Sequence, residues 1–148
     1  MSGRSPATGR LPVFQVELSC PQPPELVWQK LWDLERHSLA VPLTRVRAEG
    51  SPELRRGSHF VARTGVGPLA LDDWMTVREW SPPTRARIEK TGPLLHGTIT
   101  VELSPTGTGT RLTWRQGYGA RGLPAVMARA LVPFVARGYR VALGRILS

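Results

Sequence analysis

The feature that most constrains the fold is a series of six short segments between Thr44 and Tyr118 in which apolar and polar residues tend to alternate. Such alternation is typical of a strand with one buried face and one solvent face. Glycine- and proline-rich turns such as Gly65-Val66-Gly67-Pro68 separate the segments. Connections this short join antiparallel neighbours, because parallel strands need a crossover of about a dozen residues or more. The sequence therefore predicts antiparallel strands at Thr44–Glu49, Ser58–Thr64, Leu69–Trp80, Thr84–Thr91, Leu94–Ser104 and Thr110–Tyr118.

The region before these segments predicts a further strand and a helix. Residues 13–19, VFQVELS, alternate in the same way. The following ELVWQKLWDL places Trp28 and Trp32 one helical turn apart on one face. Pro24 suits the first turn of this helix, where the N–H that it lacks would have no partner. The less regular residues 35–42 leave open a simple link or a short second helix.

Residues 123–147 predict a long C-terminal helix. Its expected apolar stripe consists of Val126, Ala130, Phe134 and Val141, beside a stripe of Arg129, Arg137 and Arg140. Seven strands and this helix indicate an α+β fold in which a curved antiparallel sheet wraps around the C-terminal helix. Such a sheet either closes on side chains or leaves a pocket beneath the helix, and the many small residues favour a pocket.

The size and composition of the chain indicate one domain. It has 148 residues, of which 41% are hydrophobic, and we expect residues 1–10 to be a flexible tail and 11–148 the domain. The single cysteine, Cys20, excludes an intramolecular disulfide. The N-terminus lacks the apolar core of a signal peptide, and the longest apolar run contains Arg129 and is too short for a membrane span. A cytoplasmic protein is therefore expected.

The net charge of +9 is unevenly distributed, because no acidic residue follows Glu102. There is no dense Lys/Arg block and no interleaving of aromatic and basic residues, so a nucleic-acid partner is not expected. The arginines of the last helix leave open a contact with an anionic membrane or an acidic partner. The sequence does not determine the oligomeric state.

The stretch GYGARG, residues 117–122, matches the glycine pattern G-x-G-x-x-G of dinucleotide-binding loops. That function needs a parallel strand after the helix and an acidic residue about 20 positions further on. Here no strand follows the helix, and Arg140 lies near the place of the acid. We therefore expect the glycines to form the turn between the last strand and the helix, and we expect no nucleotide cofactor.

Metal and nucleophile sites are not expected either. His37, His59 and His96 lack the spacing of a zinc site, and no nucleophile elbow of the form G-x-S-x-G occurs. Alternation in LALDDWMTV turns Asp73 inward with Met75, and a buried carboxylate needs either a cationic partner or a ligand. Asp73, His37 and Tyr118 are the candidate catalytic residues, although a structural or surface role is open for each.

Aromatic and apolar residues supply the other candidate contacts with a ligand. By alternation Trp114, Gln116 and Tyr118 share the core face of the last strand. Core packing is an equally good explanation for each aromatic residue. The candidate ligand-binding residues are Trp28, Trp32, Asp73, Met75, Trp114, Gln116, Tyr118, Val126, Ala130 and Phe134.

The order of elements resembles the START-like or Bet v1-like superfamily (SRPBCC), in its branch of polyketide cyclase/dehydrase and lipid-transport proteins. The resemblance runs from Leu11 to Leu147 through PQPPELVWQKLWDLERH, Gly57, WSPPTR and GTITVELSPTGTGTRLTW. It implies a helix-grip fold with an apolar cavity, and members that bind lipids, sterols or polyketides. It carries over no catalytic residue, because the family shares no catalytic signature.

Three functions remain open. The first is binding of a small hydrophobic or aromatic ligand, such as a lipid or a polyketide, between sheet and helix. The alternative is a polyketide cyclase or dehydratase that uses acid/base residues in the cavity; an all-apolar lining would reject it. The third is an interaction module based on the arginine stripe.

Overall fold

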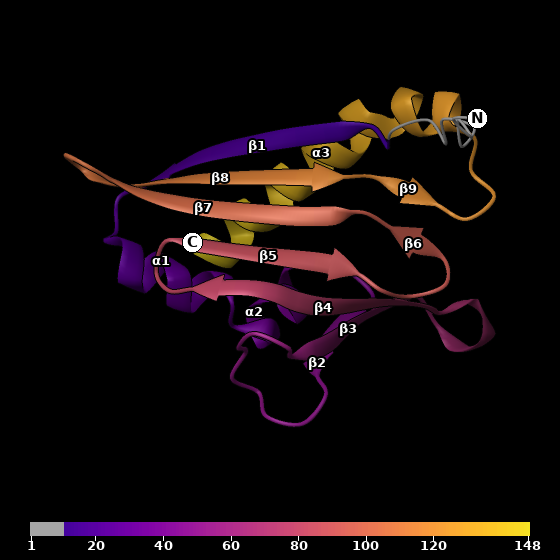
Figure 1. Ribbon diagram of the computed structural model, residues 1–148, viewed down its shortest axis with the longest axis horizontal. Helices are drawn as coiled ribbons and strands as arrows, with labels where there is room; N and C mark the ends of the chain where they lie inside the picture. The colour runs from indigo at the N-terminus through magenta and orange to yellow at the C-terminus, as the bar shows by residue number, and fades with distance from the viewer. Residues whose placement is uncertain (1–10) are drawn as a thin grey trace, which may run out of the picture.

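The computed structural model describes residues 11–148, so the expected tail at residues 1–10 lies outside the described part of the chain. Its main sheet has seven antiparallel strands in the order β1-β8-β7-β5-β4-β3-β2 (Figure 1). These strands are β1 (Val13–Cys20), β2 (Thr44–Ala48), β3 (His59–Thr64), β4 (Leu71–Ser81), β5 (Arg85–Lys90), β7 (Thr98–Thr106) and β8 (Gly109–Gly117). A small second sheet pairs β6 (Leu95–His96) with β9 (Gly119–Ala120).

Three α-helices and one short 3-10 turn complete the described part of the fold. Two short helices, α1 (Pro24–Leu31) and α2 (Leu34–Ala40), connect β1 to β2, and η1 (Gly67–Leu69) lies between β3 and β4. Pro24 is in the first turn of α1, as its missing N–H predicts. The long helix α3 (Ala125–Leu147) crosses one face of the curved main sheet (Figure 1). The α+β helix-grip fold predicted from the sequence is therefore confirmed.

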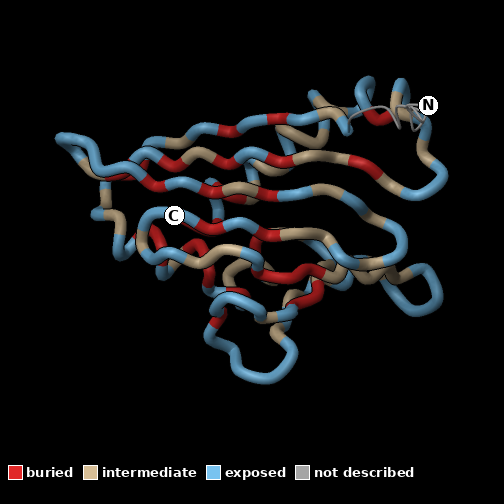
Figure 2. The backbone as a smooth tube through the Cα atoms, viewed as in Figure 1, coloured by how far each residue is buried: buried red, intermediate tan, exposed pale blue. Residues whose placement is uncertain are grey.

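The core lies between the concave face of the sheet and the helices. Alternate residues of the strands point into it, so buried and exposed positions alternate along β1, β7 and β8 (Figure 2). Val16, Val101 and Leu112 are almost completely buried at the centre of this face. At about 25 cal/mol per Å² of apolar surface removed from water, this burial is the main stabilising contribution.

The predicted strand Leu94–Ser104 is in fact two strands, because Gly97 breaks it. Gly97 has a φ of +136°, which L side chains rarely adopt, and a Cβ there would lie 2.1 Å from the carbonyl oxygen of Gly117. The backbones of β7 and β8 therefore approach closely at this point. On the N-terminal side of Gly97 the chain forms β6, which pairs with β9 rather than with the main sheet.

A β-bulge in β4 changes which residues face the core. The register shifts between Val77 and Glu79, so that Val77 is paired with Ile88 and Trp80 with Ala86. The extra residue places Glu79 with the solvent-side charges and Trp80 against the core. Strict alternation from Val77 would have reversed the positions of Glu79 and Trp80.

Candidate functional site

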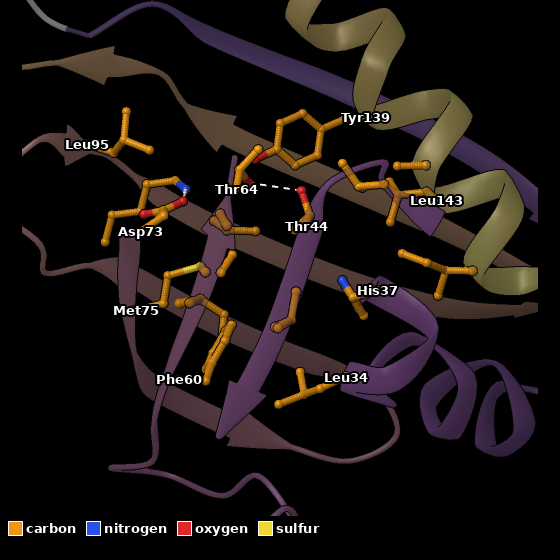
Figure 3. A pocket seen from close by; sticks show the side chains of 18 of the residues that line it. Leu34, His37, Thr44, Phe60, Thr64, Asp73, Met75, Leu95, Tyr139 and Leu143 are labelled. Atoms are coloured by element: carbon orange, nitrogen blue, oxygen red, sulfur yellow. Dashed lines mark hydrogen bonds and ion pairs between the residues drawn. The ribbon is translucent and has the colours of Figure 1, made fainter. Parts of the chain in front are cut away.

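A pocket of about 430 Å³ lies between the main sheet and α3. Figure 3 shows side chains from the strands, from α2 and from α3 converging on it. Most of its lining is apolar, and the residues that line it from the strands include Val46, Phe60, Ala62, Leu71, Met75, Ile88, Ile99 and Trp114. Concave sites of this size and composition are typical of pockets for small molecules.

Small residues leave this space empty. Gly138 and Ala142 lie on the side of α3 that lines the pocket, and Ala62 lies opposite them on β3. A Cβ added at Gly138 would have no atom within 4 Å. Because tightly packed cores have few voids larger than a water molecule, a space of this volume is a property of these residue choices.

One end of the pocket holds a buried ion pair. Lys90 on β5 donates a hydrogen bond from Nζ to Oδ2 of Asp73 on β4 (Figure 3). The side chains are only 5% and 14% exposed, respectively. Burial lowers the pKa of Lys90, but the neighbouring Tyr139 and Asp73 raise it more, so its pKa is raised overall and the amine stays charged. The second carboxylate oxygen, Oδ1 of Asp73, is buried with no hydrogen-bond partner among the described residues.

A second polar group, the hydroxyl of Tyr139, enters the pocket from α3 (Figure 3). Trp114 Nε1 donates to Gln116 Oε1 at 3.0 Å, and Gln116 Nε2 donates to the Tyr139 hydroxyl at 3.1 Å. Indole nitrogen can only donate, so this chain fixes the orientation of the Gln116 amide. The Tyr139 oxygen therefore acts as an acceptor toward Gln116 and keeps its own hydrogen for another partner.

His37 on α2 lines the pocket at another point, where Nε2 contacts the carbonyl oxygen of Leu31 at 2.5 Å. Burial lowers the pKa of His37, against the smaller opposing effects of that carbonyl and of Asp33. The imidazole is therefore neutral at pH 7 and donates from Nε2, because a carbonyl oxygen can only accept. Nδ1 is then the unprotonated nitrogen.

Tryptophans close one side of the pocket. The ring of Trp32 lies 5.8 Å from that of Trp28, 5.2 Å from that of Trp80 and 6.5 Å from that of Trp114, measured between centroids. The ring centroids of Trp28 and Trp80 are 4.8 Å apart, and the rings of Trp28, Trp32 and Trp80 pack edge to face. Of these tryptophans, Trp32 and Trp114 line the pocket. The indole nitrogen of Trp32 is buried and has no hydrogen-bond partner within residues 11–148.

The structure brings together only part of the residues predicted as ligand contacts. Trp32, Asp73, Met75 and Trp114 line the pocket, as does the catalytic candidate His37. Trp28, Gln116 and Tyr118 do not line it. Trp28 packs against Trp32, and Gln116 is 1% exposed and donates a hydrogen bond to Tyr139. Tyr118 is partly buried against the core.

The predicted apolar stripe on the C-terminal helix has the wrong phase. Val126 and Phe134 are 72% and 75% exposed, and Ala130 also faces solvent. The opposite side of α3 contacts the core, through Ala128, Val132, Val135, Tyr139, Leu143 and Ile146. Apolar residues occur on both sides of this helix, so periodicity could not distinguish them. The solvent side also carries Arg129 and Arg137, and its contact with an acidic partner or a membrane remains a prediction.

Sequence reasoning missed Lys90 and Tyr139. Lys90 follows Ile88 at the spacing of one strand face, so the alternation that placed Asp73 inward also places Lys90 inward. This signal was present, and pairing β4 with β5 would have found the ion pair. Tyr139 depends on the phase of α3, which the pattern did not determine.

The GYGARG stretch forms the end of β8, the short strand β9 and a turn before α3. Gly122 has a φ of +81°, a conformation that glycine adopts without strain. In the described residues no strand follows α3, so the stretch joins a strand to the last helix as predicted.

Within residues 11–148, no group of three or more His, Cys, Asp or Glu side chains is placed to hold a metal ion. In the same part of the chain, no helix combines the length and the apolar character needed to cross a membrane.

Comparison with protein families finds one matching model over residues 13–146, described as "Polyketide cyclase / dehydrase and lipid transport". No curated protein matches the sequence. Among solved structures, TTHA0849 from Thermus thermophilus is similar, with 16% identity and a TM-score of 0.73 over 91% of this chain and 94% of that one.

Two other solved structures are also similar to this chain. The di-domain ARO/CYC StfQ from the steffimycin biosynthetic pathway has a TM-score of 0.72 at 16% identity, over 93% of this chain and 50% of its own. Ara h 8.0201 has a TM-score of 0.65 at 13% identity, over 93% of this chain and 98% of its own. At these identities the likeness establishes the fold alone.

Proposed function

The chain belongs to the polyketide cyclase/dehydrase and lipid transport family, and from this premise we propose that residues 11–148 act as one domain that binds a small, largely apolar molecule between the sheet and α3. The observation that carries the proposal is the pocket of about 430 Å³ with a mostly apolar lining. Binding of an apolar molecule there is favoured because it removes apolar surface of both partners from water.

The test uses the neutral dye N-phenyl-1-naphthylamine, whose fluorescence rises in an apolar site. We expect saturable binding of one dye per chain. Ala142→Phe places a ring in the pocket and should weaken binding at least about tenfold, because it occupies the space that the dye needs. Val141→Phe adds the same ring at the preceding, exposed position and should leave binding unchanged. Absence of saturable binding, or equal effects of both variants, would overturn the proposal.

A second candidate function is a reaction of the cyclase or dehydratase type on a polyketide-like substrate. The observation in its favour is that the pocket is not lined by apolar groups alone: Asp73, Lys90, Tyr139 and His37 all contribute titratable groups. A carboxylate that lines such a pocket is suited to accept a proton from a carbon next to a carbonyl group, and a nearby N–H or O–H donor stabilises the resulting enolate. The similar StfQ is described as an ARO/CYC from a biosynthetic pathway.

Mass spectrometry and NMR of a synthetic oligo-β-ketone separate the two functions. An enzyme would accelerate ring closure, with loss of one water when dehydration follows. Asp73→Asn should abolish the acceleration, because the amide cannot accept the proton. Asp72→Asn, which changes the neighbouring, more exposed carboxylate, should not. An unaccelerated reaction with intact binding would leave only the binding function.

A further inference from the structure

One end of the molecule is formed by loops and by the start of α3. The β3–β4, β5–β6 and β9–α3 connections all lie at this end, which is on the right in Figure 1. Backbone hydrogen bonds tie these connections to neighbouring segments: Gly65 donates to the carbonyl oxygen of Leu43 at 2.9 Å, and Arg121 donates to that of Leu94 at 2.7 Å. We call the surface made by Leu43 and residues 65–71, 91–98 and 117–129 the loop surface.

The loop surface exposes large apolar side chains to solvent. In the β3–β4 connection Leu69 is 87% exposed and Val66 is 67% exposed, and Val126 at the start of α3 is 72% exposed. The exposed large apolar residues of this surface are Leu43, Val66, Leu69, Leu94, Val126 and Met127. The turns at the opposite end of the sheet, residues 81–84 and 106–109, contain no large apolar residue. Single exposed apolar residues are common in proteins, but a group of them on one surface marks an interaction site.

The backbone of Leu43 is strained. Its φ of +57° lies in the left-handed region, which a residue with a bulky side chain rarely adopts. Its side chain is 70% exposed, so burial of this leucine does not compensate for the conformation. Strained backbone is concentrated at functional positions. A strained and exposed leucine beside the pocket residue Thr44 therefore supports a function for this surface.

The charges of the loop surface have one sign. Residues 65–71, 91–98 and 117–129 contain no Asp or Glu, and their basic residues other than histidine are Arg121 and Arg129. Both arginines are exposed, and neither takes part in an ion pair within residues 11–148. Asp72, which follows this surface in sequence, is paired with Arg63 at 3.8 Å. The surface is therefore both apolar and cationic.

This combination restricts the partner. Two copies of the same cationic surface would repel each other, so charge disfavours a second copy of the chain. A purely polar acidic partner would pair with the arginines but would leave the leucines and valines unburied. The surface of an anionic membrane supplies both a negative potential and an apolar layer directly beneath it.

We propose that the loop surface docks on anionic membranes, with Leu69 and Val126 in the lipid layer and Arg121 and Arg129 against lipid phosphates. This inference goes beyond the proposed binding function and does not depend on it. Leu71 and Leu95 belong to the loop surface and also line the pocket. A docked protein therefore holds this side of its pocket at the lipid surface.

Sedimentation with lipid vesicles tests the electrostatic part of the proposal. We expect binding to an equal mixture of phosphatidylcholine and phosphatidylglycerol to be at least about tenfold tighter than binding to phosphatidylcholine alone. Arg121→Gln with Arg129→Gln should weaken binding to the mixture at least about tenfold. Arg55→Gln with Arg56→Gln removes the same charge from the exposed β2–β3 loop and should have at most about a twofold effect. Equal losses in the two double variants would show attraction by net charge alone and would overturn the proposal.

The apolar part has its own variants. Leu69→Ser should weaken binding to the mixed vesicles at least about tenfold, because the leucine no longer enters lipid. Leu39→Ser, at an equally exposed leucine of α2, should leave binding unchanged. Since Cys20 is buried, a polarity-sensitive dye can be attached to Leu69→Cys or to Leu39→Cys. Its emission should move to shorter wavelength on the vesicles at position 69 only; no change there, or the same change at both positions, contradicts insertion.

Further measurements separate the other partners. Binding to poly-glutamate without binding to vesicles would assign the surface to an acidic protein. Self-association that Leu69→Ser abolishes, measured by analytical ultracentrifugation, would assign it to a second copy of the chain. Either result overturns the proposal. N-phenyl-1-naphthylamine, added without vesicles, should bind Leu69→Ser as it binds the wild type. Vesicle docking by a wild-type protein that does not bind the dye would support the docking proposal and refute the binding function alone.

Discussion

The two ends of the space under α3 differ in how they are filled, although strand β4 contributes to both, with Trp80 at one end and Asp73 at the other. At one end Trp28, Trp32 and Trp80 pack with ring centroids 4.8 to 5.8 Å apart. At the other end Ala62 and Gly138 leave a pocket bordered by Asp73, Lys90 and Tyr139. We call these the tryptophan end and the pocket end. The comparison shows that side-chain volume decides where this fold is solid and where it is hollow.

The largest expected effect is at the tryptophan end. Trp80→Ala should lower the free energy of unfolding by about 3–5 kcal/mol, because it removes a ring from a closely packed cluster. Urea unfolding followed by circular dichroism measures this. Trp74→Ala, on the other face of the same strand, should cost clearly less. Equal losses would show that the tryptophan end is no better packed than the outer face.

The turn before α3 should have a smaller but distinct effect. Gly122→Val places a β-branched residue at a φ of +81° and should lower the free energy of unfolding by about 1–2 kcal/mol. Thermal unfolding provides the measurement. Gly107→Val, at a glycine with ordinary φ and no atom near a new Cβ, is the control and should cost less. A Gly122→Val protein as stable as the control would contradict a role for Gly122 in setting the start of α3.

The pocket end should accept an added side chain. Gly138→Ala is expected to raise the free energy of unfolding by about 0.5–1 kcal/mol, because alanine favours a helix and the new methyl group meets open space. Gly144→Ala, elsewhere in α3 and also in open space, should give a similar gain. Urea titration compares the two. A loss of stability in Gly138→Ala alone would mean that the pocket end is not hollow.

The smallest effect concerns pH. Burial lowers the pKa of His37 in the folded state. As the pH falls below the ordinary histidine pKa of 6.5, the unfolded chain therefore binds a proton at His37 more readily than the folded protein does. Stability should therefore decrease as the pH falls below 6.5, and it should be insensitive to this group above that value. His37→Gln should reduce this acid sensitivity, measured by urea unfolding between about pH 5 and pH 8, while His96→Gln at an exposed position should leave it unchanged. Identical pH profiles of the two variants would contradict the burial of His37.

The sequence predicted strands well, because alternation and turn residues act locally. The same alternation placed Asp73 and Met75 in the pocket. It could not place Glu79 and Trp80, since the bulge that shifts the register of β4 leaves no clear pattern. The local pattern also could not predict which side of α3 contacts the core, because both sides carry apolar residues and only packing against the sheet selects one.

The pairing of β1 with β8 has a consequence for how the chain is made. Val13 lies opposite Gly117, and α3, which covers the concave face, comes after both in sequence. During synthesis from the N-terminus, the first strand therefore stays unpaired on this edge until the residues up to Gly117 have left the ribosome. Until then the face that will hold the pocket is uncovered, a condition in which nascent chains aggregate. We expect slow folding for this topology, since its main contacts join distant residues, and a benefit from chaperones that shield apolar strands.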